Sequence, residues 1–315
     1  MVDSKQQWKA WIYLAPAIIL LPVFTVWPII STVRMAFLNG YKGLEAVGGA
    51  TFNFGIENFT KVVKYKKFTQ CLKNTILLCV LTVPISTFLA LIIAVCLNSI
   101  KVFQKALQTI FFLPYVTNSI AIGMVFAAMF NIVGSFLGTS NELVQTAGII
   151  NNVIMFFGGE KINWINAGSS YVANMTVMTV YIVWNALPFK ILILLGGLQS
   201  INKQYYDAAK VDGTRRIRVF WRITVPLLSP MLAYVIITGF IGGFKEYTSI
   251  VGIFGEKMGP ADDSKRLNTM VGFIYDSLST NNQGRASAAA LILFGIILIV
   301  TLINLYVGKK RVHYA

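Results

Sequence analysis

The chain of 315 residues is poor in charge, in histidine and in cysteine. Charged residues make up 12% of it and hydrophobic residues 56%, whereas about a quarter of a soluble domain is charged. The only histidine, His313, lies in the C-terminal tail, so no histidine-based metal site or catalytic triad is expected. Cys71, Cys79 and Cys96 show no disulfide or metal spacing, and we interpret them as buried structural thiols.

The sequence also lacks a G-x-x-x-x-G-K-[ST] loop and any set of a nucleophile with a base. We therefore expect no catalytic residue, no metal, no bound cofactor and no nucleotide site in this chain. The 27 Lys and Arg outnumber the 12 Asp and Glu, giving a net charge of +15. Beside apolar segments such basic residues meet anionic lipid and fix topology, so lipid and not nucleic acid is the expected partner.

Long apolar segments are abundant, and six of them exceed the roughly 20 residues that cross a bilayer as a helix. The first has a long apolar run with three prolines and no convincing cleavage site, so we interpret it as a retained span and not a signal peptide. The sequence predicts an all-α integral membrane protein with a single transmembrane domain over residues 1–315. The six spans are expected at about 11–37, 72–97, 106–131, 171–197, 230–252 and 287–307.

The distribution of basic residues predicts that both termini are cytoplasmic. The side that holds the termini carries 13 Lys and Arg, and the other side carries 11 over nearly twice the length. The segment "KVVKYKK" at 61–67 opposes this trend. Four charged residues lie near predicted span ends, where long side chains are expected to reach the interface: Arg34, Lys190, Lys245 and Glu246.

A charged loop, "KQYYDAAKVDGTRRIRVFWRITVPLLSP" at 203–230, separates two of these spans. Asp212 and Gly213 are expected to end a first helix, because glycine readily takes the left-handed conformation. Thr214 is expected to cap a second, amphipathic helix, which Pro226 ends, and Ser229-Pro230 is expected to begin the next span. A small-residue helix with an exposed face indicates a segment that enters a groove of another protein.

The loop resembles the cytoplasmic signature loop of bacterial ABC importer permeases, written E-A-A, three residues, G, nine residues, an apolar residue and P. Here it reads Asp207-Ala208-Ala209, Gly213 and Val225-Pro226, and the longer sugar-permease version also matches Asp212, Phe220 and Pro230. Asp207 replaces the usual glutamate and Thr214 the usual alanine. The residues that the resemblance assigns to ATPase coupling are Tyr206, Asp207, Ala208, Ala209, Asp212, Gly213, Phe220 and Pro226.

The resemblance to carbohydrate-type permeases extends in order over most of residues 11–308. It rests on "LAPAIILLPVFTVWPIISTVRMAF", "FGIENF", "IFFLPYVTNSIAIGMVF", "FKEYTSIVGIFG", "MGP" and "IYDSLSTNNQGRASAAALILF". One glycine precedes the proline of "MGP" where two are usual. The resemblance implies a maltose-type, or type I, ABC importer fold in a bacterial cell membrane.

The same resemblance implies an importer of several subunits. A second permease, as a heterodimer, would complete the pathway, two ATPases would carry ATP and Mg, and an extracellular or periplasmic solute-binding protein would deliver a sugar or oligosaccharide. Residues expected to face the solute, as polar or aromatic groups inside spans three to five, are Asn118, Ser119, Asn174, Tyr181, Trp184, Asn185 and Tyr247. Hydrogen bonding between helices is the alternative role for each.

Two other interpretations stay open at this point. The solute of an ABC importer with this loop can also be glycerol phosphate, phosphate or a polyamine. An ion-coupled secondary transporter would normally carry acids at mid-membrane or broken half-helices, and no acid lies clearly at mid-membrane here. A membrane sensor or scaffold would leave the signature loop unexplained.

Overall fold

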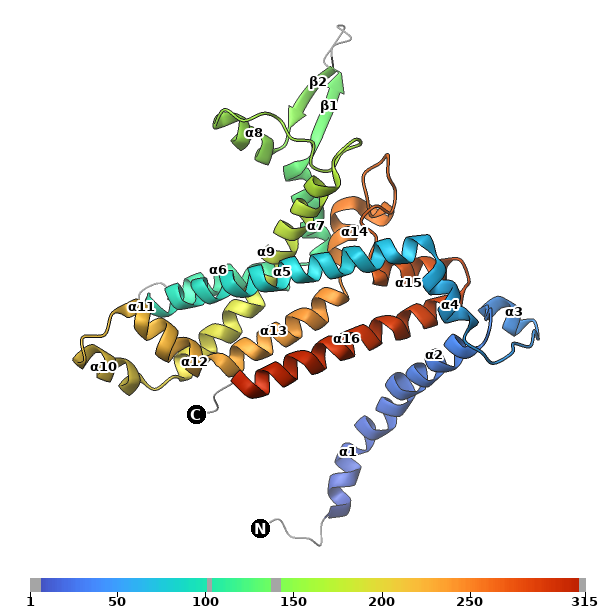
Figure 1. Ribbon diagram of the computed structural model, residues 1–315, viewed down its shortest axis with the longest axis horizontal. Helices are drawn as coiled ribbons and strands as arrows, with labels where there is room; N and C mark the ends of the chain where they lie inside the picture. Colours follow the sequence, from blue (N-terminus) through green and yellow to red (C-terminus); the bar gives the residue numbers. More distant parts are fainter. Residues whose placement is uncertain (1–6, 101–103, 137–142, 312–315) are drawn as a thin grey trace. The chain divides into compact units, whose positions relative to one another are not determined.

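The computed structural model describes residues 7–100, 104–136 and 143–311, which are mostly helical (Figure 1). The elements of the first half are α1 (Gln7–Leu21), η2 (Pro22–Val26), α2 (Trp27–Phe37), α3 (Gly43–Val47), α4 (Glu57–Lys64), α5 (Lys66–Ser99), α6 (Gln104–Val116), α7 (Ser119–Phe130), β1 (Ile132–Phe136), β2 (Leu143–Ala147) and α8 (Ile149–Phe156). Those of the second half are α9 (Tyr171–Ser200), α10 (Lys203–Val211), α11 (Arg216–Val219), η3 (Phe220–Thr224), α12 (Val225–Leu227), α13 (Ser229–Phe244), α14 (Thr248–Phe254), η4 (Gly255–Lys257), α15 (Met270–Ser279) and α16 (Gln283–Arg311).

The chain divides into two compact units. The smaller unit contains the residues up to Thr69 together with Gly272–Gly295. The larger unit contains Gln70–Val271 together with the residues from Ile296 onward. The helices α5, α15 and α16 each contribute to both.

In the smaller unit, one buried asparagine closes the turn after α2. The amide of Asn58 donates to the carbonyl oxygens of Ala36 and Leu38 at 3.0 and 2.7 Å, and its oxygen accepts from the backbone N–H of Gly40 at 3.1 Å. Asn58 is 1% exposed. Since buried backbone groups need partners, this single side chain replaces the hydrogen bonds that the end of α2 loses. The asparagine of "FGIENF" is therefore structural.

The larger unit is built around α9. Ser170 caps this helix, because its hydroxyl accepts from the N–H of Ala173 at 3.1 Å. Fifteen of the thirty residues of α9 are buried, which fits a helix enclosed by others and not one that faces lipid on most sides. Around it α6, α7, α13 and α14 pack, and two apolar clusters form, one centred on Tyr181 and the other on Leu194.

Four helical segments among the described residues are long and apolar enough to cross a membrane: Trp11–Phe37, Lys66–Ser99, Tyr171–Ser200 and Gln283–Lys309. Two further pairs of helices pass the same test only together, Ala106–Val116 with Ser119–Phe130, bent by 98°, and Arg216–Leu227 with Ser229–Phe244, bent by 67°. By length and composition the described chain can thus cross a membrane four to six times, and the six predicted spans stay a prediction.

The predicted third and fifth spans are not continuous helices. Residues 106–131 break at Asn118, whose side chain accepts from the N–H groups of Ile120 and Ala121 at 2.9 and 3.3 Å and so starts α7 as a new helix. Residues 230–252 break after Phe244, and Glu246 starts α14 in the same way. Hydrophobicity alone does not reveal these breaks, because polar side chains that accept from backbone N–H groups make them.

The segment 132–170, expected only as a loop, contains secondary structure of its own. Strands β1 and β2 pair antiparallel, with Ile132 opposite Ala147 and Phe136 opposite Leu143. The short helix α8 follows directly, and all three elements lie together at the C-terminal end of α7 (Figure 1). This hairpin is an addition to an otherwise helical fold in the described chain.

The close packing of α7 on α14 gives the first testable prediction. A Cβ added at Gly123 would lie 2.7 Å from the Cα of Gly252, which is backbone and cannot turn aside. We expect Gly123→Ala to lower the free energy of unfolding by about 1–3 kcal/mol, as overpacking does. Gly196→Ala in α9, where a Cβ meets nothing within 4 Å, should be neutral or stabilising by up to about 1 kcal/mol. Unfolding in mixed micelles measures both, and equal effects would contradict the assignment of a tight contact.

Candidate functional site

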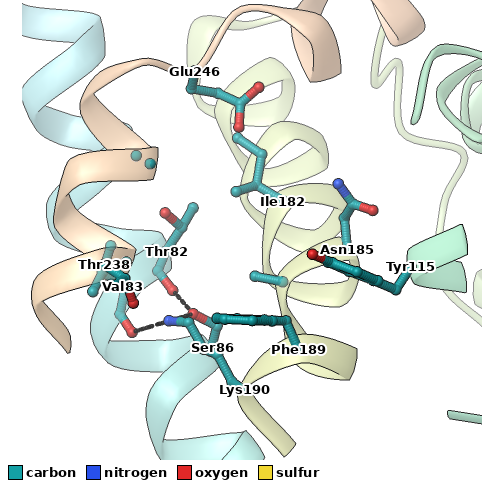
Figure 2. A pocket seen from close by; sticks show the side chains of 14 residues that line it. Thr82, Val83, Ser86, Tyr115, Ile182, Asn185, Phe189, Lys190, Thr238 and Glu246 are labelled. Carbon is teal, nitrogen blue, oxygen red and sulfur yellow. Dashed lines mark hydrogen bonds between the residues drawn. The ribbon is translucent and has the colours of Figure 1, made fainter. Parts of the chain in front are cut away.

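A cavity of about 300 Å³ opens in the larger unit between α5, α9 and α13. That volume is at the lower end of the range of small-molecule sites. The lining residues are Thr82, Val83, Ser86, Tyr115, Ile182, Asn185, Ala186, Phe189, Lys190, Thr238, Gly239, Gly242, Gly243 and Glu246. Figure 2 shows most of them, with Glu246 and Lys190 at opposite ends of the view.

Lys190 is buried inside the protein, which corrects the expectation that it reaches the membrane interface. It lies within α9 and is 5% exposed. Its ammonium donates to the hydroxyl of Ser86 at 2.7 Å and to the carbonyl of Val83 at 3.3 Å (Figure 2), and to the hydroxyl of Thr87 at 3.0 Å, all on α5. A buried charge in a membrane-spanning helix is costly and is usually functional. Arg34 and Lys245, by contrast, are exposed.

Two glycines of α13 allow this arrangement. A Cβ at Gly239 would lie 3.3 Å from the Lys190 nitrogen and 3.1 Å from Val83, and one at Gly243 would lie 2.8 Å from the sulfur of Cys79. The four-residue spacing of these glycines indicates close helix packing. The structure places that packing between α13 and α5 within one chain.

Three polar groups of the cavity wall make no hydrogen bond within the described residues: the hydroxyls of Thr82 and Tyr115 and the amide of Asn185. The Glu246 carboxylate accepts from the backbone N–H groups of Tyr247 and Ser249 and also bonds to the Ser249 side chain. The Tyr115 ring stacks on Phe189, with centroids 5.9 Å apart and an interplanar angle of 19°. An aromatic surface beside free hydroxyl and amide groups and a carboxylate suits a ligand with apolar faces and many hydroxyls.

Of the residues expected to face a solute, only Asn185 lines this cavity. Asn118 caps α7, and Asn174 donates to the carbonyl of Trp164 and to the hydroxyl of Ser169 at 2.7 and 2.9 Å. The phenol of Tyr181 is buried and donates to the carbonyl of Ser119.

Trp184 packs on Phe126, and Tyr247 packs against the cluster around Tyr181. These are the interhelical roles that the sequence left open as the alternative. The other polar residues of the wall were not among those expected to face a solute: Thr82, Ser86, Tyr115, Lys190, Thr238 and Glu246.

The first arm of the charged loop is the helix α10. Asn202 caps it, and Gly213 ends it with φ of +62°. The N–H of Thr214 bonds to the carbonyl of Ala209, and that of Gly213 to the carbonyl of Lys210, each at 3.0 Å. This is a Schellman motif, so the expected left-handed glycine is confirmed. Thr214 itself belongs to this helix end and does not cap the next helix.

The second arm does not end at Pro226 as expected. It runs through α11, a π-helical turn at η3 and α12, with Pro226 inside the last. Proline lacks an N–H, and here the N–H of Val225 reaches back to the carbonyl of Phe220 in a wide turn. Ser229 begins α13 as expected. Figure 1 shows the two arms as neighbouring helices joined by a short turn.

The residues assigned to coupling gather on α10 and at its junction with the second arm. Asp207, Ala208, Asp212 and Gly213 are exposed, whereas Ala209 is 6% exposed. The hydroxyl of Tyr206 lies 3.3 Å from that of Thr224, so a polar contact joins the two arms. Asp207 accepts from Lys210 of the same helix at 2.9 Å, and both side chains are largely exposed. Phe220 and Pro226 lie in the second arm.

Metal and thiol chemistry find no site among the described residues. Within them no three His, Cys, Asp or Glu come close enough to hold a metal ion. None of the three cysteines forms a disulfide within the described residues, and Cys71 and Cys79 are buried as expected. Cys96 is exposed, which corrects the expectation for that residue.

Two solved structures have the same fold over nearly the full length. One is a bacterial ABC transporter involved in the import of the acidic polysaccharide alginate, with a TM-score of 0.76, 20% identity and coverage of 97% of this chain and 96% of that chain. The other is a bacterial alginate ABC transporter in complex with an alginate pentasaccharide-bound periplasmic protein, with a TM-score of 0.77, 19% identity and the same coverage. The expected helical fold of a type I ABC importer permease is confirmed.

Residues 83–313 match the family described as "Binding-protein-dependent transport system inner membrane component", and the chain belongs to that family. The lactose transport system permease protein LacF of Rhizobium radiobacter is 28% identical, over 96% of this chain and 95% of LacF. The arabinooligosaccharides transport system permease protein AraP of Bacillus subtilis (strain 168) is 28% identical, over 94% and 87%. The sn-glycerol-3-phosphate transport system permease protein UgpA of Agrobacterium fabrum (strain C58) is 27% identical, over 96% of each.

Family membership identifies the chain as the inner-membrane permease subunit of an ABC importer, which is a transport component and not the ATPase. The resemblance first indicated by the charged loop is thereby confirmed.

The wall around Lys190 gives the second prediction. Thr87→Val removes one acceptor from a buried ammonium, so we expect a loss of about 1–3 kcal/mol in the free energy of unfolding. The same change in a Lys190→Met background should cost much less, because the ammonium that needed the hydroxyl is gone. Thr176→Val is the matched control, since its hydroxyl donates to the carbonyl four residues earlier, as Thr87 does, without a lysine. Additive costs in the double mutant would contradict the coupling.

Proposed function

We propose that this chain forms, with a second permease subunit, the pathway through which a sugar or oligosaccharide enters the cell. The observation that carries the proposal is the cavity of a permease that combines the stacked Tyr115–Phe189 pair with unpartnered hydroxyl and amide groups and a carboxylate. Sugars bind through stacking on aromatic rings and through dense hydrogen bonds, and this wall offers both. The names of the lactose and arabinooligosaccharide relatives support the same solute class.

In this proposal Asn185 and the groups around it replace most of the solute-facing residues first inferred from the sequence. Asn118, Ser119, Asn174, Tyr181, Trp184 and Tyr247 then act by holding the wall helices in place. Because Asn118 starts α7 and Tyr181 bonds to Ser119, a change in either is expected to act on folding as well as on uptake.

The coupling of transport to ATP is assigned to partner ATPases that bind ATP and Mg. The exposed face of α10, with Asp207, Ala208 and Gly213, is the surface that fits a groove of such a partner. We also propose an extracellular or periplasmic solute-binding protein as the donor of the sugar, a heterodimer of permeases, and a membrane topology with both termini and the charged loop in the cytoplasm.

Glycerol phosphate is the second candidate solute, and the relationship to UgpA favours it. A polyamine has no comparable observation in its favour. An ion-coupled secondary transporter is not favoured, because the family of this chain is described as a binding-protein-dependent transport system. Uptake of labelled lactose, maltose, an arabinooligosaccharide and sn-glycerol-3-phosphate, in cells that express the full importer, separates these solutes. Uptake of glycerol phosphate without any sugar would overturn the main proposal.

Gly213 gives a test of the coupling assignment. A Cβ at this position meets nothing within 4 Å, so Gly213→Val should fold, at a conformational cost of roughly 1–2 kcal/mol. We expect uptake to collapse, because α10 ends at a different angle and no longer fits its partner. Gly213→Asn should retain more uptake, since asparagine tolerates the left-handed region, and Asp207→Asn should be mild.

The measurements for Gly213 are sugar uptake in cells and retention of the ATPase on the purified complex. Normal uptake by Gly213→Val would mean that the loop is only a connector. Equal failure of the asparagine and valine variants would mean that contact with the partner at this position, and not backbone conformation, decides coupling.

Membrane topology is tested by cysteine labelling in intact cells. After the three native cysteines are replaced, Arg216→Cys should resist an impermeant thiol reagent, because the loop is proposed to be cytoplasmic. Glu160→Cys, on the opposite side in this proposal and exposed like Arg216, should label. A reversed pattern would overturn the topology and the coupling assignment together.

A further inference from the structure

The cavity contains two charged side chains that are not paired with each other, and their hydrogen bonding differs. Lys190 and Glu246 both line it, at opposite ends of the view in Figure 2. No ion pair within 4.0 Å joins either of them to another described residue. The hydrogen bonds of each side chain determine whether its charge remains available to a solute.

Lys190 has no donor left for a solute. An ammonium carries three N–H groups, and the three acceptors on α5, from Ser86, Thr87 and Val83, account for all of them. The two hydroxyls are fixed in turn, because Ser86 donates to the carbonyl of Thr82 and Thr87 donates to that of Val83. A phosphate or carboxylate could reach the ammonium only by displacing these wall contacts.

Glu246 keeps part of its acceptor capacity. One of its carboxylate oxygens accepts from the backbone N–H groups of Tyr247 and Ser249 at 3.0 and 3.1 Å, and so fixes the start of α14. The Ser249 side chain also bonds to the carboxylate, and because a carboxylate offers about four lone-pair sites, one acceptor site remains in a residue that lines the cavity. A carboxylate oxygen accepts hydrogen bonds from sugar hydroxyls, and such charge-assisted bonds are roughly twice as strong as neutral ones.

We propose that Glu246 is a specificity-determining residue, which binds hydroxyls of an uncharged sugar and excludes anionic solutes, while Lys190 is a fixed counter-charge held in the wall. This inference rests on the proposed function of sugar uptake and narrows its solute class. The physical reason is the mismatch an anion would meet. It would face a carboxylate that repels it and an ammonium whose protons are all taken, in a site where the protein screens charge weakly.

The test measures binding to the complete importer in lipid nanodiscs without its solute-binding protein, so that only the pathway selects. The readout is the thermal unfolding midpoint, which rises with any ligand that binds the folded state. The probes are lactose, maltose and cellobiose, glucuronate-containing disaccharides of matching size, sn-glycerol-3-phosphate and spermidine. We expect a neutral disaccharide to raise the midpoint in the millimolar range and the anionic probes to leave it unchanged.

Glu246→Gln removes the charge and keeps an oxygen that can accept from both backbone N–H groups, so α14 keeps its start. Replacing a charge-assisted hydrogen bond by a neutral one should weaken binding of the neutral disaccharide roughly fivefold to tenfold. The same variant should now bind the matching glucuronate disaccharide to a similar extent. Glu256→Gln, an exposed carboxylate ten residues further on, is the matched control and should change neither.

Several outcomes overturn the inference. Stabilisation of the unaltered importer by a glucuronate disaccharide as strong as that by a neutral sugar would overturn it and leave sugar uptake standing. Unchanged selectivity in Glu246→Gln would do the same. Stabilisation by glycerol phosphate or spermidine alone, or by no probe, would overturn the proposed function together with it. If Glu246→Gln does not fold, the same probes are measured on Glu246→Asp. This variant keeps the charge, so the inference requires that the anionic probes still leave its unfolding midpoint unchanged.

Discussion

The arrangement of the larger unit depends on one buried ammonium. Lys190 lies in the middle of the most enclosed helix, and its cost of desolvation is met by oxygen atoms of a neighbouring helix and not by a carboxylate. Two of those oxygens are hydroxyls of Ser86 and Thr87, one turn or less from Pro84, where α5 loses a backbone donor.

The same ammonium determines what α13 can carry on its inner face. A Cβ at Gly239 would lie 3.3 Å from the Lys190 nitrogen and 3.1 Å from Val83, so a side chain there would require both neighbours to move. The absence of side chains on that face leaves room for the cavity, which Gly239, Gly242 and Gly243 line. The cavity and the site of the buried ammonium therefore depend on the same packing of α13. A substitution that changes this packing is expected to alter both.

The sequence predicts the class of fold and the end of α10 in the charged loop because both depend on local patterns. Apolar length identifies helices that can cross a bilayer, and the Asp212-Gly213 pair identifies a helix end, since few residues tolerate a φ of +62°. The breaks in the third and fifth spans were not predicted. Asn118 and Glu246 lie where one helix ends and the next begins, and their side-chain oxygens accept hydrogen bonds from backbone N–H groups there. Such bonds leave the hydropathy of the segment unchanged.

The solute wall was the least predictable part, for a reason that applies to polar residues in membrane helices generally. Asn174, Tyr181 and Asn185 are all polar groups on α9, yet Asn174 and Tyr181 use their hydrogen-bonding groups on neighbouring backbone or side chains, while Asn185 is left with a cavity in front of it. Residue type states how many hydrogen bonds a side chain needs, and not which neighbour supplies them. Only the packing of α5, α6 and α13 on α9 distinguishes a group that holds helices together from one that is free to bind. It follows that Lys190, which by charge alone would be the obvious contact for a solute, is the charged group least available to one, and this is why we propose the Glu246 carboxylate for that role.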